Sequence, residues 1–289
     1  MNIILLSGGS GKRLWPLSNE ARSKQFLKVL HNENNGYESM IQRIYRQINK
    51  NCKNANIIVA TGSNQYEAIR NQIGEEIEVV VEPERRDTFP AISLACSYLY
   101  YKKNLSKDDP VIIVPVDPYT DNEYFRTLNR MFEYVTHSNT EILLMGIVPT
   151  YPSAKYGYII PKTNTDESNT QIYHVAKFTE KPSENEAEEL IKEGAFWNGG
   201  VFALKIGYVL NILSGFIGFD SYESVLNQYH LLKKISFDYE IVEKAKQIEA
   251  MVYKGTWKDL GTWNTLTEVM NKTEIGNIIK DEKCDNTHI

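Results

Sequence analysis

Short apolar runs alternate with amphipathic helical patterns through the first half of the chain, and this alternation limits the folds that the chain can adopt. The runs, rich in Ile, Val and Leu, lie at residues 2–6, 57–60, 77–81, 111–116 and 142–148. The segments between them carry apolar residues at helical spacing, at 37–48, 64–73, 87–98 and 122–135. Strands and helices that alternate in this way form parallel βαβ units. We therefore predict an α/β fold with a doubly wound sheet, whose ligands gather beyond the carboxyl ends of its strands.

The second half of the chain has a different pattern. Two apolar segments, 158–161 and 173–178, predict paired strands across a polar surface loop at 162–169. Ser183 and Glu186 form a capping-box pattern at the start of a charged helix, 183–193. Further predicted elements are strands at 196–204 and 250–253 and helices at 207–213, 222–232, 239–246 and 265–270. We expect a mixed sheet with a small antiparallel portion.

Composition narrows the function classes. The 289 residues suffice for one large domain, and a net charge of −5 argues against general nucleic-acid binding. The N-terminal apolar run lacks a charged leader, and no run of about 18 apolar residues predicts a membrane span. Cys52, Cys96 and Cys284 match no zinc or redox spacing, so we expect reduced thiols. The expected protein is soluble and cytoplasmic, with neither a nucleic acid nor a membrane as partner.

A glycine-rich turn with clustered cations follows the first apolar run, within residues 7–27, SGGSGKRLWPLSNEARSKQFL. Gly8, Gly9 and Gly11 allow a sharp bend or a close approach of the backbone to a ligand. Consecutive N–H groups in such a turn form a concave donor cluster suited to phosphate oxygens. Lys12 and Arg13 add positive charge directly afterwards. The turn indicates a nucleoside triphosphate or another polyphosphate as ligand, although a glycine turn after a strand is also ordinary structure.

Two familiar phosphate-binding motifs do not fit this stretch. A P-loop needs four residues between its first glycine and a Gly-Lys-Ser/Thr, which is absent here. The dinucleotide fingerprint needs a third glycine where Leu14 stands. A nicotinamide oxidoreductase therefore has little support.

The complete motif is more specific than its glycines. Gly-Gly-x-Gly-x-Arg-Leu-Trp-Pro-Leu-Ser, followed by Lys-Gln-Phe-Leu, resembles the signature of the sugar-1-phosphate nucleotidylyltransferases, and most closely that of mannose-1-phosphate guanylyltransferases. The resemblance implies a Rossmann-like fold of the nucleotide-diphospho-sugar transferase type. It assigns Arg13 to the triphosphate and makes Lys24 the signature lysine, both catalytic. The family usually has Pro before that lysine, where this chain has Ser23, so we expect a less stiff turn.

Two aspartates are candidates for a metal site. Asp117 ends the apolar strand in VIIVPVDPYT, where a carboxylate would point into the predicted crevice and could serve Mg²⁺. An Asp before Pro118 also suits a simple turn. Asp259 lies in GTWKDLGTW, whose tryptophans are typical of a core. This segment resembles the family's Trp-x-Asp-φ-Gly-Ser/Thr-Trp element (φ apolar), and the resemblance makes Asp117 and Asp259 the two magnesium ligands, with Asp117 catalytic.

Three further segments match the family's sugar-phosphate-binding elements. Glu180 and Lys181 belong to an EKP motif, in which the resemblance assigns the glutamate to the sugar and the catalytic lysine to its phosphate; an exposed Glu-Lys-Pro is otherwise a common turn. Asn198 lies in Trp-Asn-Gly-Gly, and its amide can donate to and accept from a pair of hydroxyls. Tyr156 and Gly157 match the element that lies under the sugar ring.

The nucleotide-binding set extends into a Glu-Pro…Arg-Asp-Thr-Phe-Pro-Ala segment. It resembles the family's Glu-Pro…Arg-Asn-Thr-Ala-Pro-Ala, with Asp87 and Phe89 as departures. Arg85 and Arg86 could steer anions or form a solvated surface pair. We treat the later Asp238-Tyr239 match as structural. The complete set implied for the nucleotide is Ser7, Gly8, Gly9, Gly11, Lys12, Arg13, Glu82 and Arg86.

These observations predict an enzyme that transfers a nucleotidyl group from a nucleoside triphosphate to a sugar 1-phosphate and releases pyrophosphate. GTP and mannose 1-phosphate are the favoured substrates, and Mg²⁺ the expected cofactor. The same reaction with CTP, UTP or dTTP or another sugar phosphate is one alternative, and a non-catalytic nucleotide-sugar-binding regulatory module is another. The expected catalytic domain spans residues 1–271. Residues 272–289 resemble the start of a linker or β-helix, and the sequence leaves open whether the chain forms a homodimer.

Overall fold

The computed structural model describes residues 1–9, 14–15, 17–19, 23–34, 36–162, 172–261 and 263–270. Gly11, Lys12 and Arg13 lie outside the described residues, as do most of the predicted polar loop and the tail after residue 270. The expectations for these positions therefore stay predictions.

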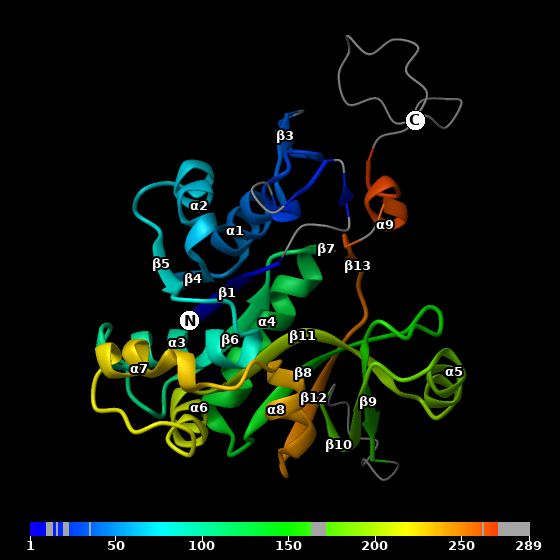
Figure 1. Ribbon diagram of the computed structural model, residues 1–289. Helices are drawn as coiled ribbons and strands as arrows, with labels where there is room; N and C mark the ends of the chain where they lie inside the picture. The colour runs from blue at the N-terminus through cyan, green and yellow to red at the C-terminus, as the bar shows by residue number, and fades with distance from the viewer. Residues whose placement is uncertain are drawn as a thin grey trace.

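A mixed sheet forms the centre of the described part of the chain (Figure 1). Its strands lie in the order β5-β4-β1-β6-β11-β8-β12-β10-β9. Their bounds are β1 (Asn2–Ser7), β4 (Asn56–Gly62), β5 (Glu78–Glu82), β6 (Pro110–Pro115), β8 (Ile142–Ile147), β9 (Gly157–Pro161), β10 (Ile172–Glu180), β11 (Phe196–Lys205) and β12 (Ile248–Tyr253). The predicted α/β class with a doubly wound mixed sheet is confirmed.

The strands of the first half pair in parallel, as the βαβ pattern predicts, with one exception. β1 pairs with both β4 and β6 in parallel, and β4 with β5. β8 does not join β6 directly, because β11 inserts between them and pairs with both in antiparallel orientation. β9 and β10 form the antiparallel hairpin expected from the second half. The antiparallel strands lie mainly toward the β9 end of the sheet.

Helices cover both faces of the sheet, because alternate strand residues point to opposite sides. Ile3 and Leu5 of β1 join one core cluster, while Ile4 joins the other. The first cluster includes residues of α1 (Met40–Asn51), α2 (Tyr66–Ile73), α4 (Asn122–His137) and α5 (Glu184–Lys192). The second includes residues of α3 (Thr88–Tyr101), α6 (Ile206–Leu213), α7 (Tyr222–Gln228) and α8 (Phe237–Glu240).

Several predicted helices are shorter than expected. The helix expected at 37–48 begins only at Met40, because Tyr37 and Glu38 form β3, which pairs with β2 (Leu30–His31). The helix expected at 222–232 is α-helical only over α7, and the 3-10 turn η4 (Tyr229–Leu231) follows it. The one expected at 239–246 is divided into α8 and another 3-10 turn, η5 (Val242–Lys244). The last helix, α9 (Trp263–Thr267), begins two residues earlier than predicted.

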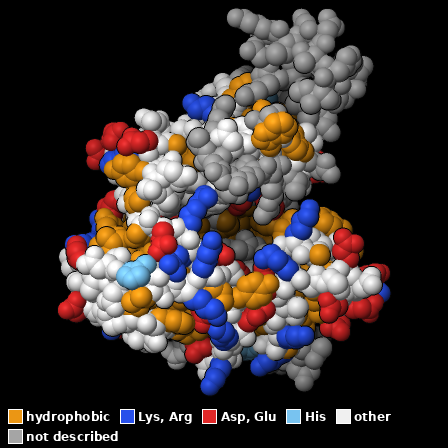
Figure 2. Space-filling model, viewed as in Figure 1, with side chains coloured by type: hydrophobic (Ala, Val, Ile, Leu, Met, Phe, Trp, Pro, Cys, Tyr) orange, Lys and Arg blue, Asp and Glu red, His pale blue; other side chains and the backbone are white. Residues whose placement is uncertain are grey.

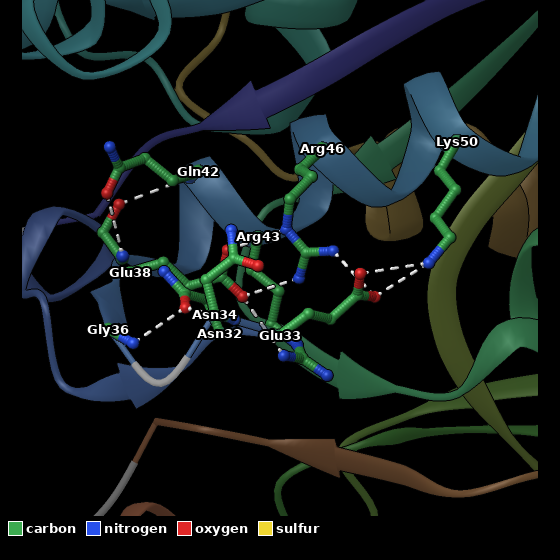
Figure 3. Close-up of polar contacts among 10 residues, drawn as sticks. Asn32, Glu33, Asn34, Gly36, Glu38, Gln42, Arg43, Arg46 and Lys50 are labelled. Carbon is green, nitrogen blue, oxygen red and sulfur yellow. Dashed lines mark hydrogen bonds and ion pairs between the residues drawn. The ribbon is translucent and has the colours of Figure 1, made fainter.

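An ion-pair cluster fixes the β2–β3 hairpin to α1 (Figure 3). The carboxylate of Glu38 is buried and accepts hydrogen bonds from Arg43 and Arg46. Arg43 also places its guanidinium 4.4 Å from the ring centroid of Tyr119. Because Tyr119 lies two residues after Asp117, this cluster supports the strand segment that follows the first candidate metal ligand.

Other expectations concern cysteines and membrane spans. Cys52 and Cys96 are free thiols buried in the core, where burial raises the pKa of the Cys52 thiol to about 11. Cys284 lies outside the described residues. Among the helices in the described ranges, none has the length and apolar character needed to cross a bilayer.

Candidate active site

A short two-stranded ladder brings the two predicted metal ligands together. β7 (Pro118–Thr120) pairs antiparallel with β13 (Trp257–Asp259), and Asp259 lies opposite Pro118. Asp117 directly precedes β7, so the ladder places it next to Asp259 although the two are far apart in the sequence. Asp259 is therefore the last residue of a short strand in a separate two-stranded sheet.

Lys24 lies between these two carboxylates. Its Nζ is 2.7 Å from Asp117 Oδ2 and 3.7 Å from Asp259 Oδ1. The lysine side chain is 13% exposed and those of the aspartates about a third, so water screens the contacts only in part. Lys24 begins the 3-10 turn η2 (Lys24–Phe26), which the buried Phe26 anchors in the core. The signature lysine and both candidate metal ligands thus form one cluster.

The described part of the glycine turn follows β1 at the carboxyl end of the sheet, as predicted. Gly9 has φ +152°, a conformation that glycine adopts readily. Its carbonyl oxygen accepts hydrogen bonds from the side chains of Ser23, Gln65 and Arg85. The hydroxyl of Ser23, which replaces the family's usual proline, therefore bonds directly to the turn.

A cavity of about 600 Å³ opens beside the glycine turn and the lysine–aspartate cluster. Figure 2 shows this face of the molecule hollowed across its middle, with Lys and Arg side chains along the rim. Cavity-lining residues with polar side chains or at the turn include Gly8, Gly9, Lys24, Gln25, Glu82, Arg85, Asp87, Asp117, Lys234 and Asp238. Glycine turn, lysine and Asp117 thus share one space of a size suited to a nucleotide.

The predicted nucleotide residues differ in their placement around this cavity. Glu82 lines it and accepts a 2.6 Å hydrogen bond from the Tyr229 hydroxyl; burial raises the pKa of Glu82, and this bond opposes the rise. Arg86 instead donates to the carbonyl of Leu232 at 2.6 Å, and its neighbour Arg85 lines the cavity. The Ser7 hydroxyl is buried, 3.5 Å from Gln25 Nε2.

The predicted sugar residues Gly157 and Glu180 face each other across the β9–β10 hairpin. A Cβ at Gly157 would collide with the Glu180 carboxylate and lie 2.7 Å from Phe178 Cζ, so only glycine leaves room for the glutamate. The Glu180 side chain is buried, and its Oε2 has no hydrogen-bond partner among the described residues. A buried carboxylate oxygen without a donor is well suited to accept from a substrate hydroxyl.

Lys181 is paired with the same glutamate. Its Nζ lies 2.5 Å from Glu180 Oε1, and burial opposes its charged form, but the bond and charge of Glu180 outweigh burial and raise the lysine pKa. Lys181 also has φ +49°, which is uncommon for a residue with a side chain. Such strain is often retained where a side chain must point to a functional site.

Asn198 contacts a residue that the sequence interpretation treated as structural. Its Nδ2 donates to Asp238 Oδ1 at 2.7 Å, and its Oδ1 accepts from the Gly200 backbone N–H at 3.1 Å. Asp238 lines the cavity, and burial together with the charge of Glu180 raises its pKa to about 7. The interpretation of Asp238 as structural is incomplete, since its carboxylate belongs to the cavity wall.

Tyr156 belongs to an aromatic cluster with two tryptophans. The ring packs against Trp197 and Trp257, with centroids 4.9 and 5.4 Å apart, beside a second cavity that Asp259 also lines. The backbone of Tyr156 stays close to the sugar residues, because its carbonyl accepts from the Lys181 N–H at 3.2 Å. Its neighbour Trp197 is a core residue, whereas Trp257 and Trp263, the two tryptophans expected in the core, are only half-buried and pack against it.

The donor set of the cluster fits a divalent cation. In the described ranges no group of three or more His, Cys, Asp or Glu side chains could hold a metal. The carboxylates that meet at the cluster are those of Asp117 and Asp259. Mg²⁺ is commonly held by one or two carboxylates while substrate phosphates and water complete its shell. Both carboxylates already converge on one positive charge, the ammonium of Lys24.

Two residues at the site, Gln65 and Arg85, had no definite role in the sequence analysis. Arg85 was left open between steering anions and a surface position, and it reaches the glycine turn. Gln65 had no distinguishing signal, because a single Gln in a polar helical segment matches no motif. Only its position beneath the turn reveals it.

Comparison with known proteins agrees with these features. A profile of the family described as nucleotidyl transferase matches residues 2–275. The chain belongs to the nucleotidyl transferase family. The resemblance found in the signature motif is thereby confirmed at the level of the family.

Curated relatives of the chain are named for alginate biosynthesis or for guanylyl transfer to mannose 1-phosphate. The chain is 29% identical to the alginate biosynthesis protein AlgA of Pseudomonas putida over 96% of its own length and 60% of that protein. It is 26% identical to the mannose-1-phosphate guanylyltransferase RfbM of Salmonella typhimurium, over 99% and 63% of the two chains. The chain thus spans about 60% of the length of these curated relatives.

Solved nucleotidyl transferase structures share the fold. A crystal structure from Thermus thermophilus, described as a mannose-1-phosphate geranyltransferase, superposes with a TM-score of 0.79 at 28% identity. The match covers 97% of this chain and 82% of that one. A putative glucose-1-phosphate thymidylyltransferase from Bacillus anthracis, at 15% identity and a TM-score of 0.63, shares the fold alone.

Proposed function

We propose that this nucleotidyl transferase family member joins a nucleoside triphosphate to a sugar 1-phosphate, with GTP and mannose 1-phosphate as its substrates and GDP-mannose and pyrophosphate as products. The convergence of Lys24, Asp117 and Asp259 beside the glycine turn is the observation that supports this most strongly. The names of the relatives support the choice of guanine and mannose.

The reaction is a direct displacement at the α-phosphorus. An oxygen of the sugar 1-phosphate forms the new bond, and the bond from the α-phosphorus to the bridging oxygen of pyrophosphate breaks. Because the sugar phosphate itself is the nucleophile, the protein has to position two anions and stabilise charge. Holding two reactants in line is worth roughly 7–11 kcal/mol.

On the nucleotide side, the glycine turn offers backbone N–H groups to the triphosphate, and Lys24 and Arg85 supply nearby positive charge. Arg13 of the signature would contact the triphosphate as the family resemblance implies. Preset cations stabilise the transition state without reorganising as charge develops. The Lys24 side chain lines the same cavity as the glycine turn, so its ammonium can reach the phosphates by moving from the carboxylates that it contacts.

On the sugar side, Glu180 and Asn198 orient the hydroxyls while Lys181 contacts the phosphate. The unpaired Glu180 Oε2 is an acceptor for a hydroxyl, and Gly157 provides the space for it. Asp238 adds a second acceptor next to Asn198. Two carboxylate acceptors near each other favour a substrate rich in hydroxyl donors, such as a hexose.

A divalent cation, for which we propose Mg²⁺, would be held by Asp117 and Asp259. When bound, it supplies charge neutralisation for the phosphates. The carboxylates hold their positions through the β7–β13 ladder. With a cation bound there, the ammonium of Lys24 would be the second positive charge of the cluster.

Pyrophosphate release measured with four nucleoside triphosphates and a panel of sugar 1-phosphates tests the proposal. We expect the highest kcat/KM with GTP and mannose 1-phosphate. A higher value for another base or sugar would reassign the substrate and retain the reaction. Nucleotide-sugar binding with no turnover in any combination would instead identify a regulatory module.

A further inference from the structure

Gln65 lies beneath the glycine turn, at the end of the 3-10 turn η3 (Ser63–Gln65), which follows β4. The residue is 2% exposed. The Nε2 group donates to the Gly9 carbonyl at 3.3 Å and to the Ser23 hydroxyl at 3.0 Å. The Oε1 atom accepts from Gln25 Nε2 at 2.9 Å and lies 3.0 Å from the Thr61 hydroxyl. A side-chain amide has two donor hydrogens and two acceptor sites, and all four have a neighbour here.

These contacts join the two segments that the nucleotide needs. Gly9 belongs to the glycine turn, whereas Ser23 and Gln25 flank Lys24 on either side. The Ser23 hydroxyl, besides accepting from Gln65, donates to the Gly9 carbonyl at 3.3 Å. One buried amide therefore sets the distance between the glycine turn and the backbone that carries the signature lysine.

We propose that Gln65 is a positioning residue for the triphosphate, which fixes the glycine turn relative to Lys24 through Gly9 and Ser23. The triphosphate as ligand rests on the proposed function. The anchored turn gives its phosphates a preset arrangement of backbone donors and ammonium, so that less ordering accompanies binding. Gln65 itself lies under the turn and acts through its neighbours.

The chemistry of the site explains why glutamine is required. Glutamate at position 65 would keep the acceptors but lose both donors, leaving the Gly9 carbonyl and the Ser23 hydroxyl facing a carboxylate. Leucine has a similar size and would remove every bond. Ser23 completes the arrangement, because its hydroxyl both accepts from the amide and donates to the turn.

The variant Gln65→Leu tests the role through the two substrates separately. We expect its affinity for GTP with Mg²⁺, measured by calorimetry, to fall about tenfold to a hundredfold, as expected for the loss of one or two buried hydrogen bonds. The KM for mannose 1-phosphate should change less than about twofold. If Gln65 had only a structural role, the substitution would lower the melting temperature and affect the binding of both substrates alike.

Gln72→Leu is the matched control. Gln72 is a half-buried glutamine whose amide is likewise bonded at both ends: its Nε2 donates to the Phe26 carbonyl at 3.0 Å, and its Oε1 accepts from the Ser39 hydroxyl at 2.6 Å. It bonds to the end of η2, the turn that begins with Lys24, but not to the glycine turn. If the link between the two segments is what matters, GTP affinity in Gln72→Leu should stay within about threefold of the wild type. An equal loss of affinity in both variants would overturn the inference.

Ser23→Ala provides a second variant if Gln65→Leu folds poorly. It should weaken GTP binding, but by a smaller factor than Gln65→Leu. In the double variant the fold-loss of affinity should be smaller than the product of the two single fold-losses, because both substitutions act through the same contact. Fully independent effects would contradict a shared positioning role.

Amide hydrogen exchange separates this inference from the proposed function. Without any ligand, exchange at Gly8 and Gly9 should be faster in Gln65→Leu than in the wild type, and unchanged in Gln72→Leu. Unchanged exchange in Gln65→Leu would overturn the inference whatever the activity. A wild type that neither binds a nucleoside triphosphate nor releases pyrophosphate would overturn the proposed function and, with it, the triphosphate as ligand.

Discussion

Lys24 Nζ lies 2.7 Å from Asp117 Oδ2, a contact that joins residues 93 positions apart. The same ammonium is 3.7 Å from Asp259 Oδ1. A lysine between two carboxylates neutralises part of their mutual repulsion and keeps both near the glycine turn. It also occupies the space toward which both oxygen ligands of a metal would point.

The first prediction concerns the two aspartates. Asp117→Asn and Asp259→Asn should each lower kcat by about a thousandfold or more, since each removes a carboxylate from the site of metal binding and charge stabilisation. The melting temperature should change little, because the β7–β13 ladder depends on backbone bonds. Asp108→Asn, in an exposed loop, is the control for the loss of one negative charge. Full activity in either variant would remove that residue from the metal site.

The second prediction concerns the lysine. Lys24→Met should bind Mn²⁺ about tenfold more tightly than the wild type in the absence of nucleotide, because no ammonium then competes for the two carboxylates. The same variant should lose at least about a hundredfold in kcat/KM. Electron paramagnetic resonance of free Mn²⁺ measures the binding directly. Weaker Mn²⁺ binding in Lys24→Met would show that the ammonium does not compete with the metal.

The third prediction concerns the space beside Glu180. Gly157→Ala should raise the KM for the sugar 1-phosphate about tenfold and leave the KM for the nucleotide within about threefold, because the new methyl group would displace the glutamate carboxylate. Gly218→Ala is the control, since a Cβ there meets no atom within 4 Å. Initial rates with each substrate varied in turn give both constants. Equal changes in the two KM values would argue against a local effect on the sugar.

The fourth prediction uses the raised pKa of Asp238. Burial and the charge of Glu180 raise it from 3.8 to about 7. Between these values the folded protein keeps a proton that the unfolded chain has lost, so the contribution of Asp238 to stability falls as pH rises through this window. Asp238→Asn keeps an acceptor for Asn198 and has no charge to bury. Its stability relative to the wild type should therefore increase between pH 4 and 8, on the order of 1–4 kcal/mol.

Urea denaturation of both proteins across this range measures that difference. Lys181 lies near Asp238, and its positive charge opposes the rise in the Asp238 pKa, an interaction that is absent in Asp238→Asn. A stability difference that does not vary with pH would mean that Asp238 ionises normally in the folded state.

The elements that were predicted from the sequence are those with strong periodic patterns. The strands β1, β4 and β6 are buried on both faces, so their central residues form continuous apolar runs, and α4 has a clear helical pattern. The capping box of Ser183 and Glu186 is present as predicted. These features depend on neighbouring residues, which a single sequence contains.

The elements that were missed depend on distant contacts. β7 and β13 have three residues each, too few to establish a period, and they are strands only because they pair with each other. β11 enters the sheet between β6 and β8, which no local pattern indicates. Asp238 and Gln65 are similar: their side chains matter because of Asn198 and Gly9, far away in the sequence.

The position of bond cleavage tests the central claim most directly. The wild-type protein is supplied with Mg²⁺, GTP and mannose 1-phosphate whose non-bridging phosphate oxygens are ¹⁸O. Mass spectrometry then gives the ¹⁸O content of each product. Attack on the α-phosphorus predicts unlabelled pyrophosphate and GDP-mannose that retains all the label. Labelled pyrophosphate, or release of orthophosphate in its place, would contradict nucleotidyl transfer at the Lys24, Asp117 and Asp259 cluster.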